Sequence, residues 1–245
     1  MANDVWQTQR QTVSLFVLTR LAISSYFLCL CYKPSAICSY SRDANMIVFW
    51  DIGGVVLTNG WDRRSRAEAA RVFNFDLADF ETQHAKVIDD FDCGRLSLEE
   101  YLTETLFHRS RPFTRQAFEK FMYAQSQPDH EVLRILERLA TDGGLVMVAL
   151  NNESVHLNQY RIDRFDLRRY FRCFLSSCYL GVRKPHDTIY ERALQIMQEP
   201  PQDCLFIDDR PENLEPAKRL KMRTVHFVNA NQLRSDLTER LGVYF

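Results

Sequence analysis

The sequence predicts an α/β protein in which a doubly wound parallel sheet carries an inserted helical bundle. From residue 130 onward, short apolar runs alternate with amphipathic helical patterns, an arrangement typical of βαβ units and a parallel sheet. Between residues 61 and 128 the chain instead contains successive helical patterns and no apolar run of that kind. A length of 245 residues suits one α/β core with an insertion, or two small domains.

The first strand is predicted at residues 46–50, "MIVFW", which is apolar throughout, as expected of a strand covered on both faces. Four helical patterns follow, at residues 62–73, 77–91, 97–107 and 115–125. Ser97 and Glu100 predict a capping box at the start of the third. The second has one apolar face, because its apolar residues and a histidine recur at steps of three or four: Leu77, Phe80, His84, Val87, Ile88 and Phe91. We expect residues 61–128 to form a helical cap.

The core is expected to comprise residues 46–60 and 129–245. A helix is predicted at residues 131–144, ending at Gly143 and Gly144. A short helix follows the second strand, and two further helices are predicted at residues 187–197 and 211–220. The remaining strands are predicted at residues 145–150, 173–177 (the weakest pattern), 204–207 and 224–227.

Composition excludes some partners. The 31 basic and 32 acidic residues nearly balance, so a nucleic-acid partner is not indicated, and any anion must be held by a local site. The seven cysteines have no CxxC spacing and no paired histidines nearby, which argues against zinc and against a disulfide framework. We therefore expect reduced thiols and a cytoplasmic protein.

Residues 1–45 do not resemble the rest of the chain. The apolar stretch at residues 14–32 is broken by Arg20 and several serines, so it does not predict a membrane span. We expect an extension that adds nothing to the fold, with Met46 as a natural start. A signal anchor or an organellar presequence, which would change the location, stays open as an alternative. No membrane association is expected for the core, and the sequence carries no signal for an oligomeric state.

Polar side chains follow three of the predicted strands, at the point where each strand ends. Asp51 follows the first strand, Asn151 and Asn152 the second, and Asp208 and Asp209 the fourth. Lys184 lies in a loop ahead of a helix. Because ligands of open α/β sheets bind at the carboxyl ends of the strands, we expect these residues to form one site.

Three converging carboxylates repel one another, and one lysine does not balance them. Mg²⁺ prefers oxygen ligands and usually keeps positions free for a phosphate. Asp51, Asp208, Asp209 and the carbonyl of Gly53 could hold such an ion. Asp51 could then attack phosphorus to form an acyl phosphate. Lys184 and the groups near Asn151 and Asn152 would bind the phosphoryl oxygens.

Four segments, "DIGGVV", "ALNNES", "GVRKPHDTIY" and "FIDDRPENL", occur in that order and resemble the four motifs of the haloacid dehalogenase superfamily. The resemblance covers residues 46–245 and is closest to members that open with "DxGGV", such as sugar phosphatases acting on glucose 1-phosphate. It implies a Rossmann-like core, a helical cap that sets selectivity, and a Mg²⁺-dependent hydrolase. The partner it implies is a small phosphorylated metabolite.

The resemblance also implies roles for individual residues. Asp51 resembles the nucleophile and a metal ligand, Asp209 the principal metal carboxylate and Asp208 its partner. The Gly53 carbonyl takes a metal-binding position. Lys184 resembles the lysine that steadies the nucleophile and the phosphoryl group, and the remaining positions are phosphate-binding or supporting: Asn151, Asn152 and Asn213.

Three positions depart from the family pattern. Gly53 stands where the commonest pattern has a second aspartate that acts as general acid and base, so we expect weak protonation of the leaving group; such help is worth about 10²–10⁴-fold. Asn151 stands where Ser or Thr is usual, which changes the fit of the phosphate pocket. Lys221 replaces a glycine, at a cost of about 1 kcal/mol if its backbone is left-handed.

The leading hypothesis is a Mg²⁺-dependent phosphatase for a small phosphomonoester, such as a sugar phosphate. A carbon–halogen hydrolase is one alternative, although it needs no metal and the adjacent Asp208 and Asp209 argue against it. A binding or regulatory protein with impaired catalysis is another, suggested by Gly53 and Asn151. We expect Arg183 to lie on the surface and the six histidines to lie in solvent or in apolar packing.

Overall fold

The computed structural model describes residues 46–141 and 144–245. The expectations for residues 1–45 and for Gly143 therefore lie outside the described residues. In chain order the elements are β1 (Met46–Trp50), α1 (Arg63–Phe73), α2 (Leu77–Asp92), α3 (Leu98–Leu102), the π-helical turn η1 (Thr103–Phe107), α4 (Arg115–Ala124), α5 (His130–Ala140), β2 (Leu145–Ala149), α6 (Val155–Arg164), η2 (Leu167–Arg169), β3 (Cys173–Phe174), α7 (Ser177–Leu180), α8 (Asp187–Met197), η3 (Pro201–Asp203), β4 (Cys204–Asp208), α9 (Pro211–Arg219), β5 (Arg223–His226) and α10 (Ala230–Leu241).

The strands form one parallel sheet in the order β3-β2-β1-β4-β5, which confirms the predicted α/β class. Strand β1 is central, and Trp50 at its end pairs with Ala149 of β2 and Ile207 of β4. This register brings the residues that follow these three strands to the same edge of the sheet.

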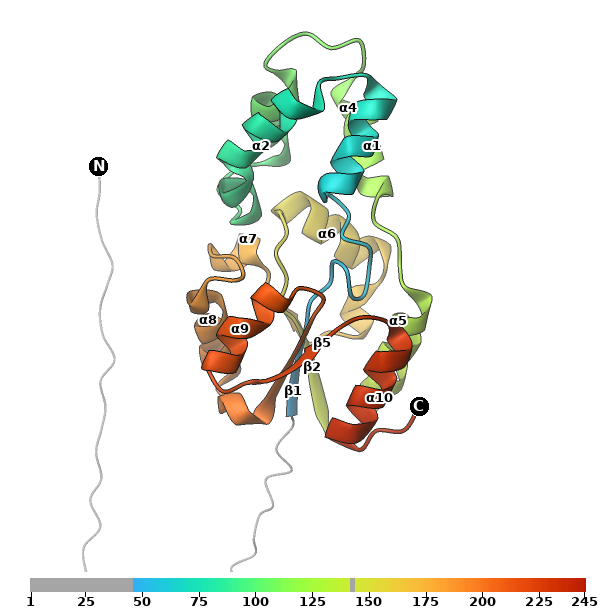
Figure 1. The fold of residues 1–245 in the computed structure, drawn as a ribbon, viewed down its shortest axis with the longest axis vertical. Helices are drawn as coiled ribbons and strands as arrows, with labels where there is room; N and C mark the ends of the chain where they lie inside the picture. Colours follow the sequence, from blue (N-terminus) through green and yellow to red (C-terminus); the bar gives the residue numbers. More distant parts are fainter. Residues whose placement is uncertain (1–45, 142–143) are drawn as a thin grey trace, which may run out of the picture. The chain divides into compact units, whose positions relative to one another are not determined.

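Side chains of β1 alternate between two apolar clusters, because successive residues of a strand point to opposite faces. Val48 and Trp50 pack with residues of α5 and α10 on one face. Ile47 and Phe49 pack with residues of α8 and α9 on the other. Helices therefore cover both faces of the sheet (Figure 1), which explains why the strand is apolar throughout.

The helices α1 to α4 with η1, here called the cap helices, have an apolar cluster of their own that includes Phe80, Phe91, Tyr101 and Phe118. They lie together beyond one end of the sheet (Figure 1). The predicted capping box is confirmed: Ser97 and Glu100 each accept a hydrogen bond from the backbone of the other. The third predicted helix is not continuous, because α3 passes into the π-helical turn η1. The domain boundaries at residues 61 and 128 stay a prediction.

Two elements differ from the sequence expectations. The strand predicted at residues 173–177 has only two residues, because it ends at Phe174 and Ser176 is already the N-cap of α7. The sequence did not predict α10, where only Ala230, Leu233 and Leu237 are buried among mostly polar residues.

Lys221 has the left-handed backbone (φ 66°) that its position after α9 raised as a possibility. The described cysteines, Cys93, Cys173, Cys178 and Cys204, are free thiols. Within the described residues, no helix combines the length and apolar character needed to cross a membrane.

Candidate active site

Three carboxylates meet at the carboxyl edge of the sheet. Asp51 is the first residue after β1, Asp208 is the last residue of β4 and Asp209 follows it. One oxygen from each lies within 4.8 Å of the others. The three acidic residues singled out from the sequence therefore form one cluster.

Lys184 reaches this cluster from the loop before α8 and is almost fully buried. Its Nζ lies 2.6 Å from Oδ2 of Asp208 and 3.0 Å from Oδ1 of Asp51. Asn152 holds the backbone of Lys184 from both sides: its side-chain amide donates to the Lys184 carbonyl and its Oδ1 accepts from the Lys184 amide, each at 2.8 Å. Asn152 is thus tied directly to the position of the lysine.

The electrostatics of the cluster reflect burial opposed by charge pairing. Burial raises the pKa of Asp51 to about 7, and Lys184 opposes this effect. Burial and the neighbouring Asp208 raise the pKa of Asp209. Burial alone would lower the pKa of Lys184, but the carboxylates of Asp208 and Asp51 raise it overall. One lysine leaves excess negative charge here, and a cation would relieve it.

The two adjacent aspartates have different surroundings. Asp208 accepts hydrogen bonds from the Arg210 backbone, from the Asn213 amide and from Lys184, so both of its oxygens are engaged. In contrast, Oδ1 of Asp209 is buried and has no hydrogen-bond partner in the described part of the chain. Buried polar oxygens are rarely left unpaired, so this atom marks a place where a ligand belongs.

The turn after β1 brings the backbone close to the same oxygens. Gly54 has φ +84°, and a Cβ built there would lie 2.2 Å from Oδ2 of Asp209. Only glycine fits this approach without displacing the carboxylate. Gly53 lines the adjoining cavity, and no carboxylate stands at its position.

Asn151 lies apart from the cavity lining. Its Oδ1 accepts from Ser176 at 2.8 Å, its side-chain amide donates to Asn158 at 3.2 Å, and the residue is 1% exposed. These contacts occupy the side chain within the protein, so its phosphate-binding role stays a prediction. Asn213 supports Asp208.

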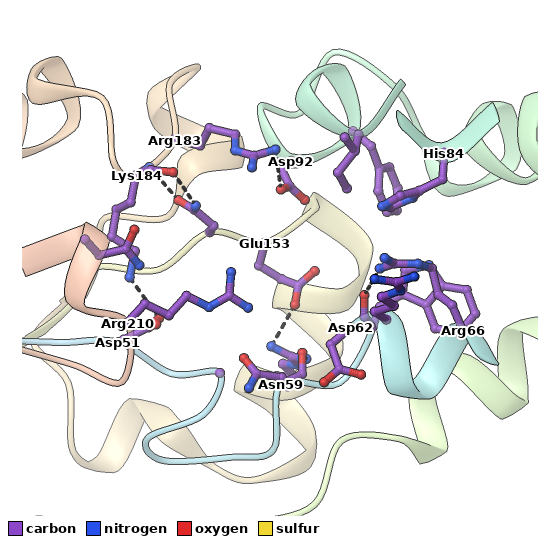
Figure 2. Close-up of a pocket in the computed structure, with 18 residues that line it drawn as sticks. Asp51, Asn59, Asp62, Arg66, His84, Asp92, Glu153, Arg183, Lys184 and Arg210 are labelled. Carbon is purple, nitrogen blue, oxygen red and sulfur yellow. Dashed lines mark hydrogen bonds and ion pairs between the residues drawn. The ribbon is translucent and has the colours of Figure 1, made fainter. Parts of the chain in front are cut away.

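A cavity of about 400 Å³ lies between the carboxylate cluster and the cap helices. Core residues such as Asp51, Asn152 and Lys184 line it on one side, and His84 and other residues of α2 line it on the other. Figure 2 shows these side chains converging from both parts of the fold.

Sequence reasoning missed several residues of this cavity. Arg183, expected on the surface, instead contacts the cap: its Nη1 lies 2.6 Å from Asp89. The same atom lies 3.3 Å from Asp92 (Figure 2). Arg161 and Glu153 form a buried ion pair at 2.7 Å. Arginines and acids in helices and loops resemble solvated residues in a sequence, so no local pattern signals these pairs.

His84 follows the expectation of apolar packing but also lines the cavity. Its Nδ1 lies 2.7 Å from the hydroxyl of Tyr101, which accepts a hydrogen bond from Trp61 at 2.9 Å. Burial, followed by the charge of Arg66, lowers the pKa of His84 to about 4. The ring is therefore neutral at physiological pH.

Comparisons of this chain with a family model and with known proteins agree on one family. A model of haloacid dehalogenase-like hydrolases matches residues 46–221. Flavin mononucleotide hydrolase 1 of Arabidopsis thaliana is 30% identical over 163 residues, 66% of this chain and 65% of that protein. Glyceraldehyde 3-phosphate phosphatase of Pyrococcus furiosus is 28% identical over 120 residues, 48% of each chain. The chain thus spans less than two thirds of the length of these relatives.

Solved structures share the fold. An enzyme of the same family from Bacteroides thetaiotaomicron, determined in complex with magnesium and inorganic phosphate, superposes with a TM-score of 0.64 at 18% identity. The match covers 73% of this chain and 92% of that one.

Proposed function

Because the chain belongs to the haloacid dehalogenase-like hydrolases, we propose that it is a Mg²⁺-dependent phosphatase that hydrolyses a small phosphomonoester through an aspartyl-phosphate on Asp51. The observation that carries this proposal is the cluster of Asp51, Asp208 and Asp209, with Lys184 as its buried cation, beside an open cavity.

The residues present fit a magnesium ion. Their donors are hard oxygens, as Mg²⁺ requires, and Oδ1 of Asp209 is buried without a partner. Asp51, Asp209, Asp208 and the carbonyl of Gly53 would hold the ion. When bound, Mg²⁺ neutralises charge on the phosphoryl group that is transferred.

Asp51 is suited to act as the nucleophile. Its Oδ1 accepts from the Ile52 amide at 2.8 Å and lies 3.0 Å from Lys184, whereas Oδ2 makes no hydrogen bond among the described residues. One oxygen is therefore fixed and the other is available to attack phosphorus. Lys184, positioned by Asn152, would stabilise negative charge on the phosphoryl oxygens.

The relatives support a phosphorylated substrate. Two curated relatives carry names of hydrolases of phosphate-bearing molecules, flavin mononucleotide and glyceraldehyde 3-phosphate, and the Bacteroides structure contains magnesium and phosphate. A sugar phosphate stays a prediction for this chain. Gly53 supplies no acid for the leaving group, so the proton for the leaving oxygen must come from another group.

The proposal is tested with purified protein and a panel of phosphorylated metabolites, measuring phosphate release. We expect activity with Mg²⁺, none after chelation, and none in Asp51→Asn. Wild-type protein quenched in acid during turnover of a radiolabelled phosphomonoester should retain covalent phosphate. Phosphate release that survives the chelator or the Asp51→Asn substitution would overturn the proposal. Metal-independent release of halide would favour the carbon–halogen hydrolase, and Mg²⁺ binding without any turnover would favour a binding protein.

A further inference from the structure

We propose that Asp92, at the end of cap helix α2, donates the proton to the leaving oxygen, in place of the carboxylate that is missing at Gly53. This inference rests on the phosphatase function proposed above. It assigns to the cap a chemical step in addition to substrate selection.

The position of Asp92 suits this role. In an in-line displacement the leaving oxygen departs on the side of phosphorus opposite the nucleophile. Asp51 lines the core side of the cavity, and Asp92 lines the cap side. A leaving group that departs from phosphorus on the side opposite Asp51 therefore moves toward the cap helices, where Asp92 lies (Figure 2).

The backbone of Asp92 is fixed to the core. Its carbonyl accepts a hydrogen bond from Oγ of Ser177, at the start of α7, at 2.5 Å. Two residues further on, Gly94 approaches α7 so closely that an added Cβ would lie 2.3 Å from the carbonyl oxygen of Cys178. Asp92 is thus held at a defined place over the cavity in this arrangement, as a proton donor must be.

The carboxyl group of Asp92 has one ion pair and accepts no side-chain or backbone hydrogen bond among the described residues. Its ion pair with Nη1 of Arg183 measures 3.3 Å, and that nitrogen makes its shorter contact, 2.6 Å, with Asp89. Among the described residues no hydrogen bond engages either side-chain oxygen of Asp92. The longer Arg183 contact is therefore the one structural interaction, in the described part of the chain, that a protonated Asp92 would weaken.

The surroundings of Asp92 favour a protonated carboxyl near neutral pH. Burial raises its pKa to about 7, the charge of Glu153 adds to this, and Arg183 opposes it. An acid with a pKa near the working pH can both give and regain a proton. The charged and titratable groups that interact with Asp92, on its own helix and on the elements packed against it, are Asp89, Cys93, Tyr101, Glu153, Cys178, Arg183 and Arg210.

Two other candidates in the cavity fit less well. Glu153 holds Arg161 at 2.7 Å and accepts from the Ser154 amide, so it is engaged as a buried carboxylate. The pKa of His84 is lowered to about 4, so its neutral ring is a poor acid at neutral pH. Burial raises the pKa of Glu153 as well, but its oxygens are held by Arg161 and Ser154. Asp92, in contrast, lines the cavity from the cap, and its carboxyl group accepts no hydrogen bond among the described residues.

In the first chemical step, Oδ2 of Asp51 forms a bond to phosphorus while the bond from phosphorus to the leaving oxygen breaks. That oxygen keeps the electron pair and takes the proton of Asp92, releasing an alcohol. In the second step the Asp92 carboxylate accepts a proton from a water molecule whose oxygen attacks phosphorus. The bond to Asp51 then breaks, and phosphate leaves with both carboxyl groups restored.

The test compares two substrates that differ in their need for a proton. Glycerol phosphate has a poor alkoxide leaving group, whereas para-nitrophenyl phosphate releases a stable phenolate. In Asp92→Asn we expect kcat/KM for glycerol phosphate to fall about 100-fold or more, with para-nitrophenyl phosphate within about threefold of wild type. The retained aryl activity also shows that the variant is folded. Asp89→Asn is the matched control, because Asp89 shares the Arg183 ion pair but does not line the cavity.

The pH dependence gives a second readout. Wild-type kcat/KM for glycerol phosphate should decline as pH rises through about 7, since Asp92 loses its proton, and Asp92→Asn should lack this decline. Equal losses for both substrates, or the same selective loss in Asp89→Asn, would overturn the role of Asp92. Failure of the phosphatase proposal looks different, because Asp51→Asn would then retain activity.

Discussion

Lys184 and Asp208 form a buried ion pair in which Nζ lies 2.6 Å from Oδ2, and neither side chain is more than 1% exposed. The pair joins the loop before α8 to the end of β4, and the same ammonium group contacts Asp51. It therefore ties together three segments of the proposed site. Removing one partner of such a pair leaves uncompensated buried charge.

The first prediction concerns this lysine. Lys184→Met should lower the free energy of unfolding by about 3–5 kcal/mol in the presence of a chelator, because the carboxylates lose their buried cation. Added Mg²⁺ should restore part of that loss. Urea denaturation with and without Mg²⁺ measures both effects. Lys218→Met is the control, because Lys218 pairs with Glu215 on the surface. Equal, Mg²⁺-independent effects in the two variants would contradict the prediction.

The second prediction concerns Gly54, in the turn after β1, and uses Gly181 as the control position. Gly181→Ala should cost only the strain of a left-handed backbone, about 1–2 kcal/mol, since nothing lies within 4 Å of an added Cβ at φ +69°. Gly54→Ala should cost more and displace Asp209, because its Cβ would lie 2.2 Å from Oδ2. We expect the Mg²⁺-induced rise in melting temperature to be lost in Gly54→Ala alone. A retained rise would show that Asp209 does not need this close approach.

The third prediction concerns the buried pair of Arg161 and Glu153. Arg161 also donates to Oγ of Ser126 and to the backbone carbonyl of Asn59, which joins α6 to the segment that follows β1. Arg161→Met should destabilise the protein by about 3–5 kcal/mol, because Glu153 is left unpaired. The double variant with Glu153→Gln should recover part of this loss. Strictly additive effects in urea denaturation would argue against coupling.

The fourth prediction concerns pH and His84. Burial lowers its pKa from 6.5 to about 4, so the unfolded chain binds a proton in this range and the folded chain does not. The stability contributed by the neutral ring should be complete above pH 6.5 and should be lost as pH falls toward 4, by about 3 kcal/mol in total. The stability difference between wild type and His84→Gln should shrink over this window in urea denaturation.

Much of the fold could be predicted from local sequence patterns. The apolar runs of β1, β2 and β4 and the cap helices such as α2 follow from hydrophobic periodicity, which each segment carries by itself. The convergence of Asp51, Asp208 and Asp209 could also be predicted, because each comes at the end of a parallel strand. The weak pattern of α10 was missed because few of its residues are buried.

Local patterns were thus enough to predict the sheet, the helices between β1 and β2, and the acidic cluster at the edge of the sheet. The packing of the whole chain was needed to show that Asn151 does not line the cavity, that Arg183 reaches the cap, and that Asp92 lines the cavity with Glu153. Hydrophobic periodicity depends only on a few neighbouring residues. The burial and charge partners of a side chain depend instead on segments far apart in the chain, and these meet only when the cap helices and the sheet pack together.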